Sequence, residues 1–456
     1  MNEALFDHID TNADEFVARV MDYVRHPSIS AHDIGIRKVA GMLVAHLEEL
    51  GFEAGLVETP GHPFVLGRFD VDPAKPTVLL YGHYDVQPPD PLEAWISPPF
   101  EPALRDGRIW ARGIGDNKGQ HFAQLLAIET HLKVHGTLPC NVIFLLEGEE
   151  EIGSPQIADF VKQNVDRLQA DLVVTSDGPL HESGQPVITF GVRGVASFDL
   201  LAKGASRDVH SGNFGGVVPN PIWTLVQLLA TMKDADGNIS VEGITEPVIP
   251  ATNLEREVIS RLPDDETAVK ADLAIDELDG PRDRPYWDRL MFHPTLTING
   301  ISGGYNGPGS KTVLPNQAIA KCDIRLVEPL TPDYVFERVE AHVARFAPEV
   351  EVIRHNGMLP SKTPLTSPFA TPLIAAVKAA RGVDPLLYPT VGGSLPDYVF
   401  TKILRLPAFV IPYANADEAN HAPNENLEVV RFVDGIKTGS ALLSELGKLS
   451  KTDLTD

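Results

Sequence analysis

Short apolar segments alternate with amphipathic segments along the first 180 residues of the chain. Apolar runs bounded by proline, glycine or charged residues predict buried strands at residues 77–81, 141–146 and 171–175. Between the first two strands, residues 118–134 predict an amphipathic helix, because apolar side chains recur at helical spacing. The apolar face of that helix would consist of Phe122, Leu125, Leu126 and Leu132. Strands that alternate with helices favour an α/β domain, in which helices flank a mostly parallel sheet.

The pattern changes near Phe190. Apolar and polar positions then alternate, as they do in strands with one exposed face, over residues 192–201, 296–300 and 318–327. A helix is predicted over residues 221–232, because a proline opens the segment and suits the first helical turn. Strands and helices without the earlier rhythm predict an α+β insert, in which residues 242–288 receive no assignment.

The apolar pattern of the first domain returns after Pro360, with a helix expected at 372–381 and a strand at 408–411. We therefore expect one domain to be formed by residues 1–189 and 361–456, with a second domain inserted between them. The insert, residues 190–360, has about 170 residues, which is close to the usual size of a domain. Two domains also suit a chain of 456 residues.

Charge and composition limit the partners of the chain. Lys and Arg number 38 against 63 Asp and Glu, which gives a formal net charge of −25. Nucleic-acid binding needs clustered cations, so this charge argues against it and against attraction to anionic membranes. Apolar runs stay well short of the roughly 18 to 20 residues of a membrane span, and the opening residues lack the apolar core of a secretory signal. We predict a cytoplasmic protein.

Acidic residues and histidines follow the predicted strands or open the predicted helix. They are His83 and Asp85, Asp116, Glu149 to Glu151, Asp177 and, after the strand at 408–411, His421. Each cluster alone also fits a surface turn, a solvated loop or a helix start. In open α/β sheets, however, ligands bind beyond the carboxyl ends of the strands, so the joint position of the clusters predicts a cation site. Because the chain has only two cysteines, histidines and carboxylates must supply the ligands.

The set fits a site for two divalent metal ions. Asp116 would bridge them, and His83 and Asp177 would bind one ion while Glu151 and His421 bind the other. Metal ions about 3.5 to 4 Å apart can share a bridging water and lower its pKa. Zinc suits such mixed ligands, although manganese or cobalt would also bind.

Two further acids have expected roles beside the ligands. Asp85 lies two residues from His83 and would hold the tautomer of its imidazole. Glu150 neighbours a ligand and would act as general base, taking a proton from the bridging water and passing it to the leaving amine.

Five motifs then occur in order: 82–88 (GHYDVQP), 112–119 (RGIGDNKG), 150–154 (EEIGS), 176–178 (SDG) and 420–423 (NHAP). Together they resemble the dinuclear zinc peptidases that include carnosine dipeptidases, glutamate carboxypeptidases, aminoacylases and succinyl-diaminopimelate desuccinylases. The resemblance extends from about residue 70 to the C-terminal end. It is greatest to the carnosinase-type dipeptidases, which have Asp, as at Asp177, where the carboxypeptidase branch has Glu.

The resemblance implies a lid domain that mediates homodimer formation and carries further site residues. His210 would reach the partner subunit's site and hydrogen-bond the oxyanion, and Arg325 would grip the substrate carboxylate through its planar fork. The turn formed by Gly392, Gly393 and Ser394 would contact the same carboxylate. A loop histidine, a strand arginine paired with a neighbouring acid, and a plain loop are the simpler alternatives. The resemblance also implies a cis peptide bond between Asp116 and Asn117.

These features predict a metal-dependent hydrolase that cleaves the amide bond of a dipeptide with a free C-terminal carboxylate, through a metal-bridging water. An N-acyl amino acid deacylase and a non-catalytic metal-binding dimer remain as alternatives. The segment 304–312 looks like a phosphate loop, yet Ser310 separates the glycine from Lys311, and Pro308 lacks an N–H donor. Nucleotide binding is therefore rejected.

Overall fold

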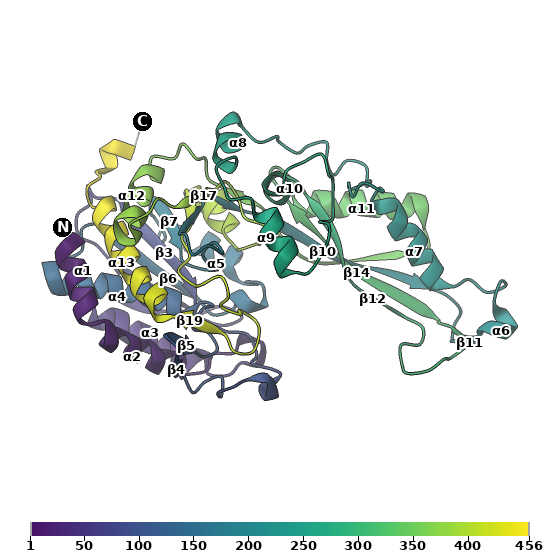
Figure 1. Cartoon of the computed structure of the whole chain (residues 1–456), viewed down its shortest axis with the longest axis horizontal. Helices are drawn as coiled ribbons and strands as arrows, with labels where there is room; N and C mark the ends of the chain where they lie inside the picture. The colour runs from purple at the N-terminus through teal and green to yellow at the C-terminus, as the bar shows by residue number, and fades with distance from the viewer. Residues whose placement is uncertain (1, 455–456) are drawn as a thin grey trace. The chain divides into compact units, whose positions relative to one another are not determined.

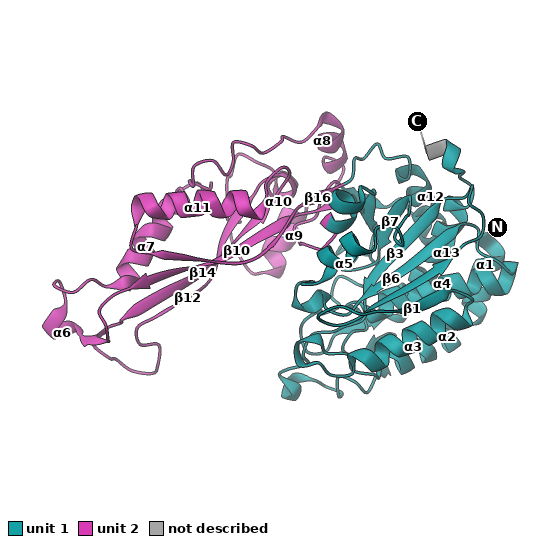
Figure 2. Cartoon of the chain, turned by 180° about the vertical axis from the view of Figure 1, so that it is seen from behind, with its two compact units in different colours: residues 1–190, 363–388, 399–456 teal, residues 191–362, 389–398 magenta. Residues whose placement is uncertain are grey.

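The computed structural model describes residues 2–454, which form two compact units. Unit 1 contains the residues up to 190 together with 363–388 and those from 399 onward, and unit 2 contains 191–362 and 389–398 (Figure 2). Residues 389–398 lie inside a segment that the sequence pattern assigned to the first domain. They belong to unit 2 because Val391 forms a β-bridge with Val192 and its carbonyl accepts the Arg193 N–H.

Unit 1 is built on an eight-stranded sheet with the order β1-β2-β6-β3-β7-β18-β8-β17 (Figure 1). The strands are β1 (Glu53–Val57), β2 (Phe64–Phe69), β3 (Thr77–His83), β6 (Asn141–Glu147), β7 (Leu172–Thr175), β8 (Val187–Thr189), β17 (Leu386–Tyr388) and β18 (Ala408–Val410). Its central strands β6, β3, β7 and β18 are parallel, whereas β1, β2 and the β18–β8 pair run antiparallel. The expectation of a mostly parallel sheet flanked by helices is confirmed.

The helices of unit 1 come from both ends of the chain. They are α1 (Asn2–Thr11), α2 (Ala13–Val24), α3 (Ile36–Glu49), α4 (Lys118–His135), α5 (Ile157–Gln163), α12 (Ala370–Arg381) and α13 (Val429–Leu446). Helix α13 packs against α4, α12 and α1, so the C-terminal segment completes a layer that N-terminal helices begin (Figure 1). Among the described residues, no helix has both the length and the apolar character needed to cross a membrane. The cytoplasmic location stays a prediction.

Helix α4 differs from the amphipathic helix that the sequence pattern predicts. Its polar side is buried as well, including His121 and His131. The His121 ring lies 2.9 Å from the Tyr23 hydroxyl, and the His131 ring lies 2.8 Å from the Ser440 carbonyl oxygen. The burial extends beyond the predicted apolar face because bonds to neighbouring helices give these polar side chains partners away from water.

Unit 2 contains a four-stranded antiparallel sheet with the order β12-β14-β10-β15. Its strands are β10 (Gly194–Lys203), β12 (Thr295–Gly303), β14 (Gln317–Leu326) and β15 (Glu351–Met358), and its longer helices are α7 (Pro221–Met232) and α11 (Pro332–Phe346). Both helices pack on this sheet and bury an apolar cluster that includes Phe198, Leu228 and Val339. Helix α7 has the predicted bounds, with Asn220 as its N-cap.

The segment that the pattern left unassigned forms short helices in unit 2. They are α8 (Asn253–Ile259), α9 (Asp265–Asp272) and the beginning of α10 (Tyr286–Phe292). Thr252 and Glu255 form a capping box at the start of α8. The segment is therefore helical in short pieces, each too brief to produce a helical repeat in the sequence.

A charged contact joins α2 to α4 in unit 1. The Arg19 guanidinium donates to both carboxylate oxygens of Glu129, at 2.6 and 3.1 Å, and the His46 ring lies 3.8 Å away. Partial burial alone would raise the pKa of Glu129. The bonds to His46 and Arg19 outweigh that effect and lower the pKa to about 2, from a usual value of 4.5. Stability gained this way is complete above about pH 4.5 and is lost as the pH falls towards 2.

We expect Glu129→Gln to lower the free energy of unfolding by about 1 to 2 kcal/mol at pH 7. The difference from the unaltered protein should shrink as the pH falls below about 4.5, because Glu129 of the unfolded chain then takes up a proton while folded Glu129 is still ionised. Urea unfolding at pH 7, 5, 4 and 3.5 measures both values. Glu58→Gln is the control: the Arg37–Glu58 pair is exposed, and its loss should have no measurable effect. An equal difference at every pH would contradict the assignment.

Candidate metal centre

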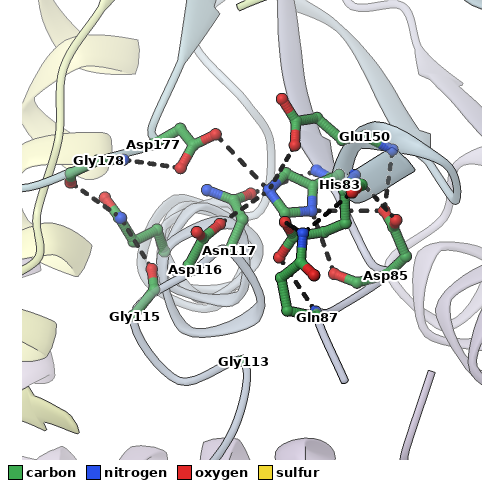
Figure 3. Close-up of polar contacts among 12 residues, drawn as sticks. His83, Asp85, Gln87, Gly113, Gly115, Asp116, Asn117, Glu150, Asp177 and Gly178 are labelled. Atoms are coloured by element: carbon green, nitrogen blue, oxygen red, sulfur yellow. Dashed lines mark hydrogen bonds and ion pairs between the residues drawn. The ribbon is translucent and has the colours of Figure 1, made fainter. Parts of the chain in front are cut away.

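Three parallel strands end side by side in unit 1, and the polar residues that follow them meet (Figure 3). The Nε2 atom of His83, at the end of β3, lies 3.1 Å from an oxygen of Asp116 and 3.6 Å from an oxygen of Asp177. A carboxylate oxygen of Glu150 lies 4.0 Å from the same nitrogen. Asp116 comes just before α4, and Asp177 follows β7. The expected convergence at the strand ends is therefore present.

Asp116 lies between two imidazoles. Its second oxygen is 3.0 Å from Nε2 of His421, which is in turn 3.2 Å from an oxygen of Glu151. One ligand atom each of His83, Asp116 and Glu151 lies within 4.8 Å of the other two. All five residues expected to bind metal thus lie within ion-pair distance of at least one other.

The electrostatics of this group suit divalent cations. Burial and the neighbouring carboxylates of Asp116 and Asp177 raise the pKa of Glu150, and burial and Asp116 raise that of Glu151. For Asp116, burial is outweighed by the bonds to His421 and His83, which lower its pKa. The buried Nε2 of His83 faces the carboxylates of Asp116 and Asp177, at 3.1 and 3.6 Å. Crowded carboxylates beside imidazole nitrogens form a donor set that fits zinc, manganese or cobalt.

Asp85 contacts both the His83 ring and the backbone of the turn at Glu150 and Glu151. Its carbonyl oxygen lies 3.1 Å from Nδ1 of His83, and its carboxylate oxygen lies 3.4 Å from the same atom. The carboxylate also accepts the backbone N–H groups of Glu150 and Glu151, at 3.2 and 3.1 Å. The sequence indicated the contact with His83, but gave no signal for this second contact, which fixes the turn that carries the general base candidate.

Gln87 is a site residue that the sequence reasoning did not single out. Its backbone N–H and side-chain amide donate to the carboxylate of Glu151, at 3.2 and 3.0 Å. Its amide also donates to the Glu151 carbonyl oxygen at 3.0 Å. Gln87 therefore orients a candidate ligand, and its place in the 82–88 motif was the available signal.

Glu425 connects the loop of His421 to the loop of Asp116. One of its buried carboxylate oxygens accepts from Arg112 at 2.7 Å and from the Gly113 N–H at 2.9 Å. The other accepts from the N–H groups of Gly115 and Asp116, at 2.9 and 3.0 Å. One side chain near the C-terminus thus satisfies four donors of a segment about 310 residues earlier in the chain, and so places Asp116.

The peptide bond between Asp116 and Asn117 is cis, so that expectation is confirmed. The Asn117 side chain accepts the His83 N–H at 3.2 Å and donates to the Ser176 carbonyl oxygen at 2.5 Å. Asn117 therefore joins the strand end at His83 to the loop of Asp177.

Glu418 is a buried acid beside the site that no sequence signal indicated. Neither carboxylate oxygen has a hydrogen-bond partner in the described part of the chain. Burial, followed by the carboxylates of Asp116, Glu425 and Asp177, raises its pKa well above the usual value. A Cβ atom on Gly115 would lie 2.3 Å from one Glu418 oxygen, so a larger residue there would have to displace the Glu418 side chain.

The remaining predicted residues belong to unit 2. Arg325, on β14, donates from Nη1 to the Ser394 hydroxyl at 2.8 Å, so the arginine and the turn at 392–394 are neighbours. Its Nε lies 3.7 Å from Asp323. His210 is exposed, and its Nδ1 accepts the Gly212 N–H at 2.9 Å. The structure therefore gathers the predicted residues into two groups, one in each unit.

Comparisons with known proteins agree with this geometry. The model of the family described as Peptidase family M20/M25/M40 matches residues 79–446. A Cys-Gly metallodipeptidase of Schizosaccharomyces pombe is 32% identical, over 98% of this chain and 99% of that protein. The structure of an M20 family metallo-carboxypeptidase, Sso-CP2 from Sulfolobus solfataricus, matches with 34% identity and a TM-score of 0.89, over 95% of this chain and all of that one. Human carnosine dipeptidase 1 matches with 28% identity and a TM-score of 0.83, over 98% and 100%.

We expect Glu425→Gln to weaken the binding of divalent metal about 10- to 100-fold, because an amide cannot accept all four donors that hold the Asp116 loop. Competition with chelators of graded strength, followed by metal analysis, measures the affinity. Glu445→Gln, which removes only the surface contact with Lys448 at 2.6 Å, is the matched control. Unchanged affinity in the Glu425 variant would show that the loop is held by other contacts.

Proposed function

Because the chain belongs to peptidase family M20/M25/M40, we propose that it is a metal-dependent dipeptidase that cleaves the amide bond next to a free C-terminal carboxylate. The observation that carries the proposal is the position of Asp116, with one carboxylate oxygen 3.1 Å from the His83 ring and the other 3.0 Å from the His421 ring. That arrangement suits two metal ions that share one ligand. The named relatives include a Cys-Gly metallodipeptidase and a carnosine dipeptidase.

The residues of unit 1 divide between the two ions. We propose that His83 and Asp177 hold one, that Glu151 and His421 hold the other, and that Asp116 serves both. When bound, such ions polarise the substrate carbonyl and lower the pKa of a water molecule. Mixed imidazole and carboxylate ligands favour zinc, with manganese and cobalt as the alternatives.

Glu150 is the proposed general base. Asp85 fixes its backbone, so its carboxylate is held beside the candidate ligands and within 4.0 Å of the His83 ring. There it takes a proton from the attacking water and later gives a proton to the amine that leaves. Proton transfer of this kind contributes about 10²- to 10⁴-fold to rate.

Unit 2 would hold the substrate. Arg325 and Ser394 are hydrogen-bonded to each other and offer a guanidinium and a hydroxyl for the substrate carboxylate. His210 would stabilise the developing oxyanion in the site of a second subunit. Its side chain is exposed, and its Nε2 has only a long contact, 3.4 Å, with the Thr312 hydroxyl.

We propose a homodimer formed through unit 2, and exposed apolar groups of that unit support it. On α7, Trp223 is 63% exposed and Val226 is 44% exposed, although both lie on a helix otherwise packed on the sheet. Strand β12 is an edge strand and exposes Ile298 and Ile301. Exposed apolar patches and open sheet edges are features that a second copy of the chain can cover.

We expect Glu150→Gln to retain its metal ions and its substrate affinity but to lose about 10²- to 10⁴-fold in turnover. Steady-state kinetics on a panel of dipeptides, together with metal analysis, measures this. Glu445→Gln should cleave the panel like the unaltered protein, because it alters only a surface ion pair. Full activity in the Glu150 variant would mean that another group takes the proton.

The same panel separates the alternatives when it includes N-acyl amino acids. Cleavage of dipeptides supports the proposal. Cleavage of acylated substrates alone would replace it with a deacylase, and no cleavage of any compound by the metal-loaded protein would favour a non-catalytic metal-binding dimer.

One set of variants tests the dimer and also shows which subunit's site His210 serves. We expect light scattering to show a dimer, and Trp223→Asp to shift it towards monomer. His210→Ala and Glu150→Gln should each be nearly inactive alone. After mixing and subunit exchange, activity should return, because a mixed dimer holds one site with an intact Glu150 and the partner's intact His210. No recovery despite proven exchange would place His210 in its own subunit's site.

A further inference from the structure

Arg193 is a buried cation in unit 2 without a carboxylate partner. It follows β9 (Gly191–Val192) and is 6% exposed. Its Nε donates to the Gly392 carbonyl oxygen at 2.9 Å, while its buried Nη1 has no hydrogen-bond partner among the described residues. A buried guanidinium whose one side-chain hydrogen bond among the described residues goes to a carbonyl oxygen has no carboxylate paired with it, which is costly unless an anion arrives.

The charges around Arg193 do not cancel. Arg325 is the other cation, and Asp323, 3.7 Å from the Nε of Arg325, is the acid near both. Burial and the charge of Arg325 lower the pKa of Arg193 to about 10, so it remains a cation at neutral pH. Two arginines and one aspartate leave this cluster with a net charge of +1. Without Arg193, Asp323 would balance Arg325, and the cluster would be neutral.

Both arginines contact one backbone turn. Arg193 donates to Gly392 from its side chain and to the Gly393 carbonyl oxygen from its backbone N–H at 3.1 Å, and Arg325 donates to the Ser394 hydroxyl. A Cβ atom on Gly392 would lie 3.1 Å from Nη2 of Arg193 and 2.8 Å from Leu290. Because residue 392 has no side chain, the Arg193 guanidinium can pack directly against the turn.

We propose that Arg193 supplies the unbalanced positive charge of the carboxylate site, so that the site selects substrates with one free carboxylate at the C-terminal end. This proposal rests on the proposed function. It adds one residue, Arg193, and a limit on the negative charge that the C-terminal end of the substrate can carry. A single carboxylate neutralises the cluster. A C-terminal amide leaves it charged, and a C-terminal acidic residue brings one negative charge too many. The site therefore favours dipeptides with a neutral C-terminal side chain.

Binding is measured by calorimetry in the Glu150→Gln protein loaded with zinc, which keeps the substrate uncleaved. The probes are Ala-Leu, its C-terminal amide, and Ala-Asp. Ala-Leu should bind at least tenfold more tightly than its amide. Arg193→Gln should remove most of this preference by weakening only the free acid. Arg354→Gln, which breaks the surface pair with Glu340 at 2.7 Å, is the control and should change nothing.

Two further variants keep the test decisive if Arg193→Gln does not fold. Arg193→Lys retains the charge and should retain most of the preference for the free acid. Asp323→Asn raises the cluster from +1 to +2 and should improve Ala-Asp relative to Ala-Leu. The proposal is overturned if the unaltered site shows no preference for the acid, or if neither Arg193→Gln nor Asp323→Asn alters the preferences. Failure of the zinc-loaded protein to cleave dipeptides would instead remove the proposed function, and would leave this binding result standing by itself.

Discussion

Repulsion between buried carboxylates is the constraint on which the metal centre depends. Asp116, Glu150, Glu151 and Asp177 crowd around two imidazoles, and burial makes the negative charges of Glu150 and Glu151 harder to keep. The raised pKa values of Glu150 and Glu151 show this cost. Cations of charge +2 relieve it more effectively than protonated histidines can, which is why the group suits a pair of metal ions.

The protein keeps these acids in place by hydrogen bonds to the backbone. Asp85 fixes the turn at Glu150, Gln87 holds Glu151, and Glu425 holds the loop before Asp116. None of the three needs to touch a substrate to matter, since each limits how far a crowded carboxylate can move away from its neighbours. Unit 2 shows the opposite imbalance, with two arginines to one acid around the turn at Gly392.

Local patterns predicted much of the fold, because period and boundary residues are local properties. Helix α7 has its expected bounds, and the central strands of unit 1 differ from expectation by a residue or two at their ends. The all-round burial of α4 could not be predicted, since it depends on which helices surround it. The predicted residues of the centre could be found because they stand in motifs. Glu425 lies two residues beyond the 420–423 motif, and its role depends on donors about 310 residues earlier. Arg193 and residues 389–398 likewise depend on pairings between distant segments.

The contacts of Glu425 also have a consequence for how the protein is made. The four donors of the Asp116 loop meet their acceptor only after about 310 further residues have left the ribosome. His421 arrives at the same stage. A nascent chain that stops short of these residues therefore lacks both a candidate ligand and the acceptor that places Asp116, so the centre assembles late and all at once.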